Sequence, residues 1–107
     1  MRLYQFILPV RSNDGRTSYE KARATCTAAA VDMAGGITEC GGAWQGAYRM
    51  SSGDIVREEV AVYLIACSVA GREELVRLAF KLFPDQEAFY VSDVGSTDII
   101  SREELIL

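Results

Sequence analysis

The sequence predicts one α+β domain in which strands and helices follow the order βαββαβ. Three observations carry this prediction: apolar runs of strand length, two segments with apolar residues at helical spacing, and polar or glycine-rich clusters between them. A chain of 107 residues, half of them hydrophobic, can bury a core as a single domain. We expect a four-stranded antiparallel sheet with two helices on one face, the ferredoxin-like arrangement.

The first strand and the first helix are marked by their ends. The strand covers Leu3–Val10, and the polar cluster 11–16 ends it. Thr17 and Glu20 have the spacing of a capping box, which predicts that the helix begins there. The glycine pair at 35–36 ends the helix.

The remaining elements are expected in the order strand, strand, helix, strand. Glycine inside a strand suggests a bulge, so we expect one at Gly41–Gly42. The expected ranges are a strand over 37–50, a turn over 51–54, a strand over 55–67, a helix over 71–83 and a strand over 86–93. The domain then covers residues 1–94, and residues 95–107 form a C-terminal tail.

The third expected strand, 55–67, is apolar on both of its faces, and the first strand is similar. An antiparallel sheet with one face in water should alternate between apolar and polar residues. The sheet face away from the helices is therefore expected to be covered, and a second copy of the chain is the simplest cover. We predict a homo-oligomer, and a dimer and a closed ring fit this reasoning equally well.

The composition excludes several classes of protein. The net charge of −4, with no run of basic residues, argues against a nucleic-acid partner. Three cysteines without Cys-x-x-Cys spacing, and no histidine, argue against a zinc or haem site. We expect reduced thiols, no metal, no membrane span, no signal peptide and a cytoplasmic location.

The best candidate site lies on the hairpin around residues 51–54. If the loop has two or four residues, Tyr48 faces Arg57, and Glu59 points to the same side of the sheet as Tyr48. A loop of odd length would instead place Glu59 on the opposite face. Tyr48 and Glu59 could also be only a cross-strand polar pair, and Glu58 or Arg57 could have other partners.

Several short motifs together resemble the phage-encoded S-adenosylmethionine (SAM) lyases, long described as SAM hydrolases. The similarity covers roughly residues 4–92, and the spacing between Tyr48 and Glu59 carries most of its weight. The matching residues are Arg11-Ser12-Asn13 after the first strand, Gly46-Ala47-Tyr48-Arg49, Glu58-Glu59, and Gln86 before the last apolar strand.

This resemblance implies an enzyme that needs no cofactor and cleaves SAM to methylthioadenosine and homoserine lactone. The carboxylate of SAM itself would displace the sulfonium, and holding that geometry can supply on the order of 7–11 kcal/mol. Tyr48 would then position the substrate, and Glu59 would orient it or act as a base for attacking water. The resemblance further implies a homotrimer with sites between subunits, in the host cytoplasm, as a counter-restriction enzyme.

Three further residues are expected to contact the substrate: Arg11, Ser12 and Trp44. For Arg11 and Ser12 the competing interpretation is that they only form a turn, and for Trp44 it is oligomer packing. The alternative for the whole protein is a non-catalytic, oligomeric, ferredoxin-like module. Such a module would bind a small molecule in the same cleft without converting it.

Overall fold

The computed structural model describes residues 1–105 and has the expected ferredoxin-like α+β fold. Its four-stranded antiparallel sheet has the order β2-β3-β1-β4. The elements are β1 (Arg2–Pro9), α1 (Glu20–Ala34), β2 (Thr38–Arg49), β3 (Ile55–Cys67), α2 (Val69–Leu82), β4 (Val91–Ser96) and the short α3 (Arg102–Leu105). None of the helices in the described part of the chain has the length and apolar character needed to cross a membrane.

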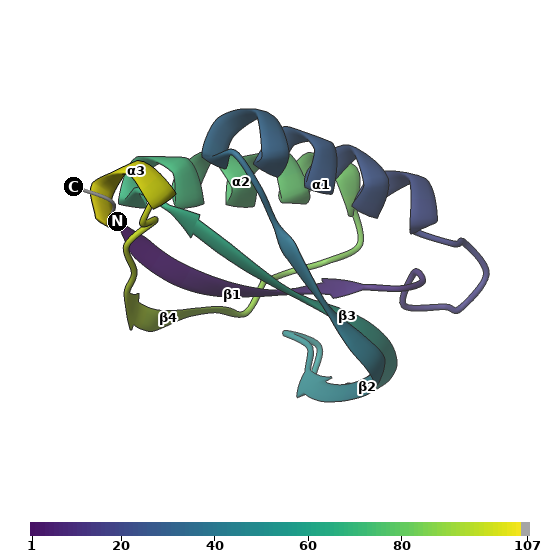
Figure 1. Ribbon diagram of the computed structural model, residues 1–107. Coiled ribbons are helices and arrows are strands. Elements are labelled where there is room, and N and C mark those ends of the chain that lie inside the picture. The colour runs from purple at the N-terminus through teal and green to yellow at the C-terminus, as the bar shows by residue number, and fades with distance from the viewer. Residues whose placement is uncertain (106–107) are drawn as a thin grey trace.

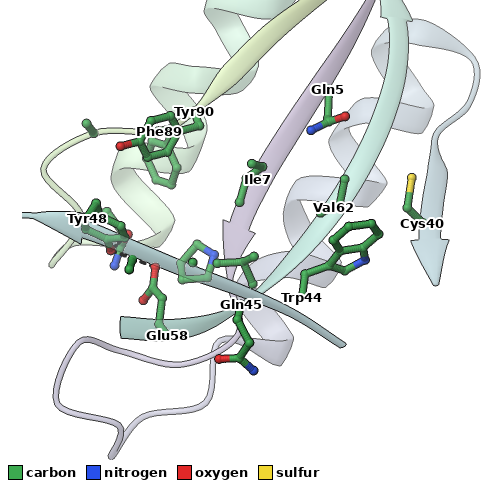
Figure 2. A pocket seen from close by; sticks show the side chains of 16 residues that line it. Gln5, Ile7, Cys40, Trp44, Gln45, Tyr48, Glu58, Val62, Phe89 and Tyr90 are labelled. Atoms are coloured by element: carbon green, nitrogen blue, oxygen red, sulfur yellow. Dashed lines mark hydrogen bonds between the residues drawn. The ribbon is translucent and has the colours of Figure 1, made fainter. Parts of the chain in front are cut away.

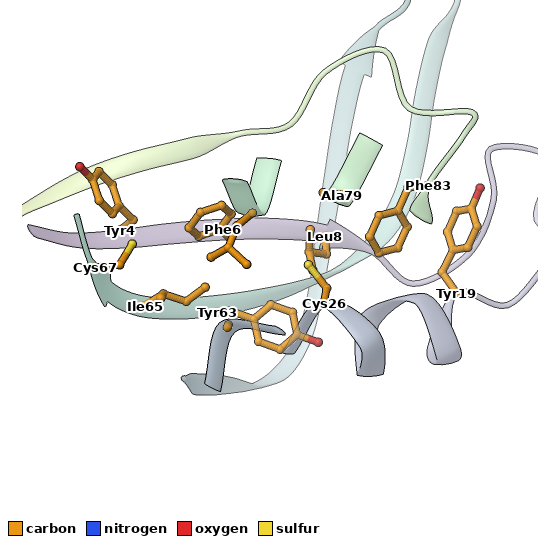
Figure 3. Close-up of a cluster of buried hydrophobic side chains, with 12 residues drawn as sticks. Tyr4, Phe6, Leu8, Tyr19, Cys26, Tyr63, Ile65, Cys67, Ala79 and Phe83 are labelled. Carbon is orange, nitrogen blue, oxygen red and sulfur yellow. The ribbon is translucent and has the colours of Figure 1, made fainter. Parts of the chain in front are cut away.

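Helices α1 and α2 lie together on one face of the sheet, while the β2–β3 hairpin extends away from them (Figure 1). The core fills the space between the helices and the sheet because alternate side chains of β1 and β3 point to the helices (Figure 3). Phe83, at the end of α2, is fully buried and packs edge-to-face against Tyr19 at 4.9 Å between ring centroids. The core side chains from the two central strands are Tyr4, Phe6, Leu8, Tyr63, Ile65 and Cys67.

The expected capping box at the start of α1 is absent. The helix begins at Glu20, and its N-cap residue, Tyr19, makes no side-chain cap. The Thr17 N–H instead donates to Ser12 Oγ at 3.0 Å, within the turn that precedes the helix. The end of the helix is as expected, since Gly35 adopts a left-handed conformation with φ +83°.

The last strand begins five residues later than predicted. β4 covers Val91–Ser96 rather than 86–93, because two residues of the preceding segment have other partners. Gln86 is buried and hydrogen-bonds through its side chain to Asn13, and Phe89 packs against Phe83. The division into a domain of residues 1–94 and a tail of residues 95–107 remains a prediction, and Ile106 and Leu107 lie outside the described residues.

The β2–β3 hairpin closes with an odd loop. The Met50 N–H donates to the Asp54 carbonyl at 2.8 Å, and the Gly53 N–H donates to the Met50 carbonyl at 2.9 Å. Three residues, 51–53, therefore form the loop, and Gly53 has the left-handed φ of +94° that such a loop requires at its last position. Tyr48 consequently pairs with Val56, not with Arg57 as predicted.

The predicted irregularity at Gly41–Gly42 is present. The β2–β3 register shifts between Cys40 and Trp44, and Gly42 has a φ of +106°. β2 lies at the edge of the sheet, and nearly all of its residues are exposed or half-exposed. An unpaired edge of this length is a surface that proteins usually cover. Together with the apolar residues on the open face, this edge is consistent with homo-oligomerisation.

Candidate functional site

A cavity of about 500 Å³ lies over the open face, the face of the sheet away from α1 and α2 (Figure 2). The sheet forms its floor, and the segment between α2 and β4 forms one wall. Aliphatic and aromatic side chains supply most of the lining, and Tyr48, Glu58 and Gln86 form a hydrogen-bonded polar group at one end. A largely apolar pocket with a few converging polar groups is typical of a small-molecule site.

Tyr48 and Glu58 meet at the polar end of this cavity. The Tyr48 hydroxyl lies 2.8 Å from Glu58 Oε1 and 3.0 Å from Gln86 Oε1. The prediction that Glu59 points to the same side of the sheet as Tyr48 is therefore wrong. The three-residue loop shifts β3 by one position, so Glu58 shares the cavity face and Glu59 is exposed on the other face.

Gln86 is held in one orientation by its amide nitrogen. Its Nε2 donates to Asn13 Oδ1 at 3.0 Å and to Asp85 Oδ1 at 3.2 Å. Because both of these partners are acceptors, the nitrogen must face them, and the amide oxygen must face Tyr48. Gln86 thus connects the cavity to the turn between β1 and α1.

Asp85 accepts hydrogen bonds from both residues of that connection, Asn13 and Gln86. It accepts hydrogen bonds from the Tyr19 hydroxyl and the Asn13 backbone N–H, both at 2.6 Å. Burial raises the pKa of Asp85, but the hydrogen bonds from Tyr19, Asn13 and Gln86 outweigh it, so the pKa lies below its usual value. The pKa of Tyr19 rises to about 12, through burial and then the hydrogen bond to Asp85. Asp85 is a fixed anion that orders the polar end of the site.

Glu58 has fewer hydrogen-bond partners than Asp85 among the described residues. Its Oε2 is buried and has no hydrogen-bond partner among the described residues. Burial raises the pKa of Glu58, and the charge of Asp85 adds to the rise, while the hydrogen bond with Tyr48 opposes it. Burial also raises the pKa of Tyr48, and its hydrogen bond with Glu58 adds to that rise. Glu58 thus keeps its proton to a higher pH than an exposed carboxyl, and one of its oxygens lacks a donor among residues 1–105.

The structure brings only some of the predicted site residues together. Trp44 lines the cavity with Tyr48, and its indole N–H donates to the Gly41 carbonyl at 3.2 Å. Arg11 and Ser12 are not among the residues that line the cavity. Ser12 is a turn residue, since its hydroxyl donates to Asp14 at 2.6 Å. That Arg11, Ser12 and Trp44 contact a ligand stays a prediction.

Four residues of the polar network were not predicted as site residues: Asn13, Tyr19, Glu58 and Asp85. Gln86 was noted only for its match to the lyases. Gly53 is the signal in the sequence that could have identified Glu58. A three-residue hairpin loop often ends in a left-handed glycine, and a loop of that length places Glu58 on the same sheet face as Tyr48. Asp85 and Asn13 are 72 residues apart in the chain, and no local pattern indicates that they touch.

Within residues 1–105, no group of three or more His, Cys, Asp or Glu side chains is placed to hold a metal ion. Cys26 and Cys67 are buried, and Cys40 is half-buried in the cavity wall. Burial raises the pKa of Cys26 to about 11, so its thiol stays protonated. The chemistry that the cavity offers is therefore hydrogen bonding, aromatic contact and one carboxyl group.

Comparison with solved structures identifies proteins of the same fold. The divalent cation tolerance protein CutA1 from Thermus thermophilus superposes with a TM-score of 0.65 at 16% identity, over 97% of this chain and 90% of that one. A CutA1 variant from Pyrococcus horikoshii gives 0.59 at 14% identity, over 98% and 91%. CutA from Synechococcus elongatus gives 0.54 at 18% identity, over 88% and 78%. No family model and no curated protein matches the chain.

These neighbours overturn the resemblance to the SAM lyases. The three structures named above are CutA or CutA1 proteins, one of them described as a divalent cation tolerance protein, and none is described as a lyase. The geometry removes the main support as well, since the resemblance depended on Tyr48 and Glu59 sharing a face. The predictions of an enzyme, of the lyase reaction and of a phage counter-restriction role were wrong. That Tyr48 and Glu59 belong to a functional site stays a prediction. SAM as a partner has no support.

Proposed function

We propose that the protein is a non-catalytic, oligomeric, ferredoxin-like module that binds a small molecule in the cavity over its open face. The observation that carries this proposal is the polar end of the cavity. There Tyr48, Glu58 and Gln86 hold one another in place, and one Glu58 oxygen has no partner in the part of the chain that the structure describes. A fixed hydrogen-bonding group at the end of an apolar cavity orients a ligand, while the apolar walls supply affinity.

Oligomerisation is the second part of the proposal. Tyr90 is 60% exposed and Trp44 is 46% exposed, although both line the cavity on the open face. A second copy that covers this face would bury both rings and close the cavity. The SAM lyase resemblance that implied a trimer was wrong, so we propose association of two or more copies without a fixed number.

The binding test uses Trp44, the only tryptophan in the chain, as a reporter inside the cavity. The protein is titrated with a panel of cationic, neutral and anionic aromatic compounds. At least one of these classes should change the Trp44 emission in a way that saturates. The panel includes Cu²⁺, Zn²⁺ and Mg²⁺ because the structural neighbours are named for divalent cation tolerance. A panel that leaves the Trp44 emission unchanged at millimolar concentration contradicts the proposal.

A cavity-filling variant shows whether the compounds bind where we propose. A Cβ at Gly46 would lie 3.4 Å from Val60 Cγ1, and Gly46 lines the cavity. Gly46→Leu should therefore occupy part of the cavity and weaken binding at least about tenfold, without removing a polar group. The control is Thr38→Leu, at an exposed position of the same strand that does not line the cavity. Equal affinity in the Gly46 variant and the wild type would place the ligand elsewhere.

Sedimentation equilibrium tests the assembly. The protein should have a mass of at least two chains at micromolar concentration, and dilution should shift it towards one chain. A single-chain mass at all concentrations would contradict oligomerisation while leaving the binding test unaffected.

A further inference from the structure

The hydrogen atoms at the polar end of the cavity can be counted. Tyr48 has one hydroxyl hydrogen but lies within hydrogen-bond distance of two acceptors, Glu58 Oε1 and Gln86 Oε1. Gln86 cannot turn to offer its nitrogen, because Nε2 is held by Asn13 and Asp85. The three oxygens of Tyr48, Glu58 and Gln86 therefore share too few hydrogens if Glu58 is ionised.

One additional hydrogen resolves the shortage. If Glu58 is protonated, it donates to the Tyr48 oxygen, and Tyr48 donates to Gln86, so both short contacts are hydrogen bonds. If Glu58 is ionised, Tyr48 donates to only one of its neighbours. The ionised group would also leave a buried charged Oε2 without a donor. These hydrogen bonds therefore favour the neutral acid when no other donor reaches Glu58.

A ligand that brings its own N–H donor changes this balance. Glu58 lines the cavity, and the terminal torsion of a glutamate is soft, so a small rotation presents Oε2 to a bound group. A cationic donor at Oε2 supplies both the missing hydrogen bond and the charge that an ionised Glu58 needs. The rings of Trp44 and Tyr90 line the same cavity and can contact a cation through their faces.

Building on the proposed binding function, we propose that the ligand is a small organic cation, an ammonium or amidinium on an apolar body. Its N–H binds the Glu58 carboxylate, and the proton that Glu58 carries in the empty site leaves to solvent. No covalent bond other than that O–H changes. An anion would meet the negative charge of Asp85 and could not stabilise an ionised Glu58, and a neutral amide would gain only one uncharged hydrogen bond.

The groups around Glu58 define what else can titrate. β2 contributes Tyr48, whose raised pKa keeps it protonated at neutral pH. The segment after α2 contributes Asp85, whose lowered pKa keeps it charged. β1 lines the cavity with Gln5, Ile7 and Pro9, which carry no titratable group. Cys40 and Tyr90 are the other titratable residues that line the cavity, and the Glu58→Gln variant separates any proton exchange at Glu58 from exchange at these two.

The experiment compares three probes of one shape and different charge: benzamidinium, benzamide and benzoate. The full chain is titrated near neutral pH with Trp44 emission and calorimetry as readouts. Benzamidinium should bind about tenfold or more tightly than benzamide, since a charge-assisted hydrogen bond is replaced by a neutral one. Calorimetry in buffers of different ionisation heat should show proton release on binding.

Two glutamine variants isolate the carboxyl group. Glu58→Gln should remove both the preference for the cation and the proton release. Glu59→Gln makes the same change in charge one residue away, on the opposite face, and should keep both. If Glu58→Gln misfolds, the carbon-13 shift of the Glu58 carboxyl in the wild type decides, because benzamidinium should lower its titration midpoint.

The outcomes separate this inference from the proposed function. Binding of benzamide or benzoate in the cavity as tightly as benzamidinium overturns the cation proposal and leaves the binding function standing. A cation preference that persists in Glu58→Gln, or an unchanged Glu58 midpoint, also overturns it. If none of the three probes binds, the cation proposal fails, and the wider panel decides the binding function separately.

Discussion

Tyr48 and Glu58 face each other across the β2–β3 hairpin, with the hydroxyl 2.8 Å from Oε1, while Glu59 points to the opposite face of the sheet. Adjacent residues of a strand point to opposite faces, so the number of residues in the loop decides which glutamate reaches the cavity. Here the three-residue loop ending at Gly53 makes that choice. The chemistry of the site thus depends on one turn.

Replacing Glu58 by glutamine should change how stability depends on pH. The folded protein raises the pKa of Glu58 through burial, above an unfolded value of about 4.3. The stability that Glu58 contributes is therefore fully present below about pH 4.3 and is lost as the pH rises through the folded pKa. Glu58→Gln has no such loss and should gain stability relative to the wild type as the pH rises from about 4.3 through the folded pKa of Glu58.

Urea unfolding at several pH values measures this difference. Glu59→Gln serves as the control, because it makes the same change of charge at an exposed residue of the same strand. A Glu58→Gln difference in unfolding free energy that does not change with pH would show that folding does not perturb the Glu58 carboxyl.

Asp85→Asn should destabilise the protein by about 1–3 kcal/mol. Asp85 accepts from Tyr19, Asn13 and Gln86, and an asparagine would point its own N–H₂ at one of these donors. Because folding lowers the pKa of Asp85, its contribution is present above about pH 3.9 and is lost as the pH falls through the folded value. The difference in unfolding free energy between Asp85→Asn and the wild type should therefore become smaller at acidic pH.

Urea unfolding at neutral pH and at about pH 3 tests both parts of this prediction. Asp32→Asn, on the exposed surface of α1, is the matched control and should change stability by less than about 0.5 kcal/mol. Equal losses for the two variants would mean that the hydrogen bonds around Asp85 do not stabilise the fold.

The architecture was predictable because it follows from patterns that repeat along the chain. The bounds of β3, Ile55–Cys67, match the prediction, since its apolar run stops at Ser68, which accepts from the Gly71 N–H and caps α2. The bulge near Gly42 was also marked by its glycines. Trp44 and Tyr48 lie on the same cavity, as their even spacing in one strand predicted.

The missed features depend on contacts between distant parts of the chain. Gln86 was predicted to begin the last strand but lies before it, because its side-chain amide hydrogen-bonds to Asn13, Asp85 and Tyr48. No local sequence pattern indicates these bonds. The sequence left the loop length uncertain by one residue. That difference decides whether Glu58 or Glu59 lies on the same sheet face as Tyr48. The family resemblance failed because its motifs were short and depended on that pairing.

The two glycines of the β2 irregularity should respond differently to alanine. Gly42 has a φ of +106°, which an L side chain rarely adopts, so Gly42→Ala should destabilise by roughly 1–3 kcal/mol. A Cβ at Gly41 would meet no atom within 4 Å, and its φ is not positive. Gly41→Ala should therefore be nearly neutral or slightly stabilising. Thermal unfolding of both variants is the measurement, and a loss at Gly41 that equals the loss at Gly42 would contradict the observed bulge.

Phe83 and Phe80 provide a matched pair on the same helical segment. Phe83 is 0% exposed and contacts the rings of Tyr19 and Phe89, whereas Phe80 is 43% exposed and contacts only Phe89 among the described aromatic rings. Phe83→Ala should cost about 3–5 kcal/mol because it removes a fully buried ring and leaves a cavity. Phe80→Ala should cost clearly less, since water already reaches that ring. Urea unfolding of both variants tests the difference. Similar losses would mean that the loop after α2 packs differently, and the position of Gln86, which follows Phe83 by three residues, would then need revision.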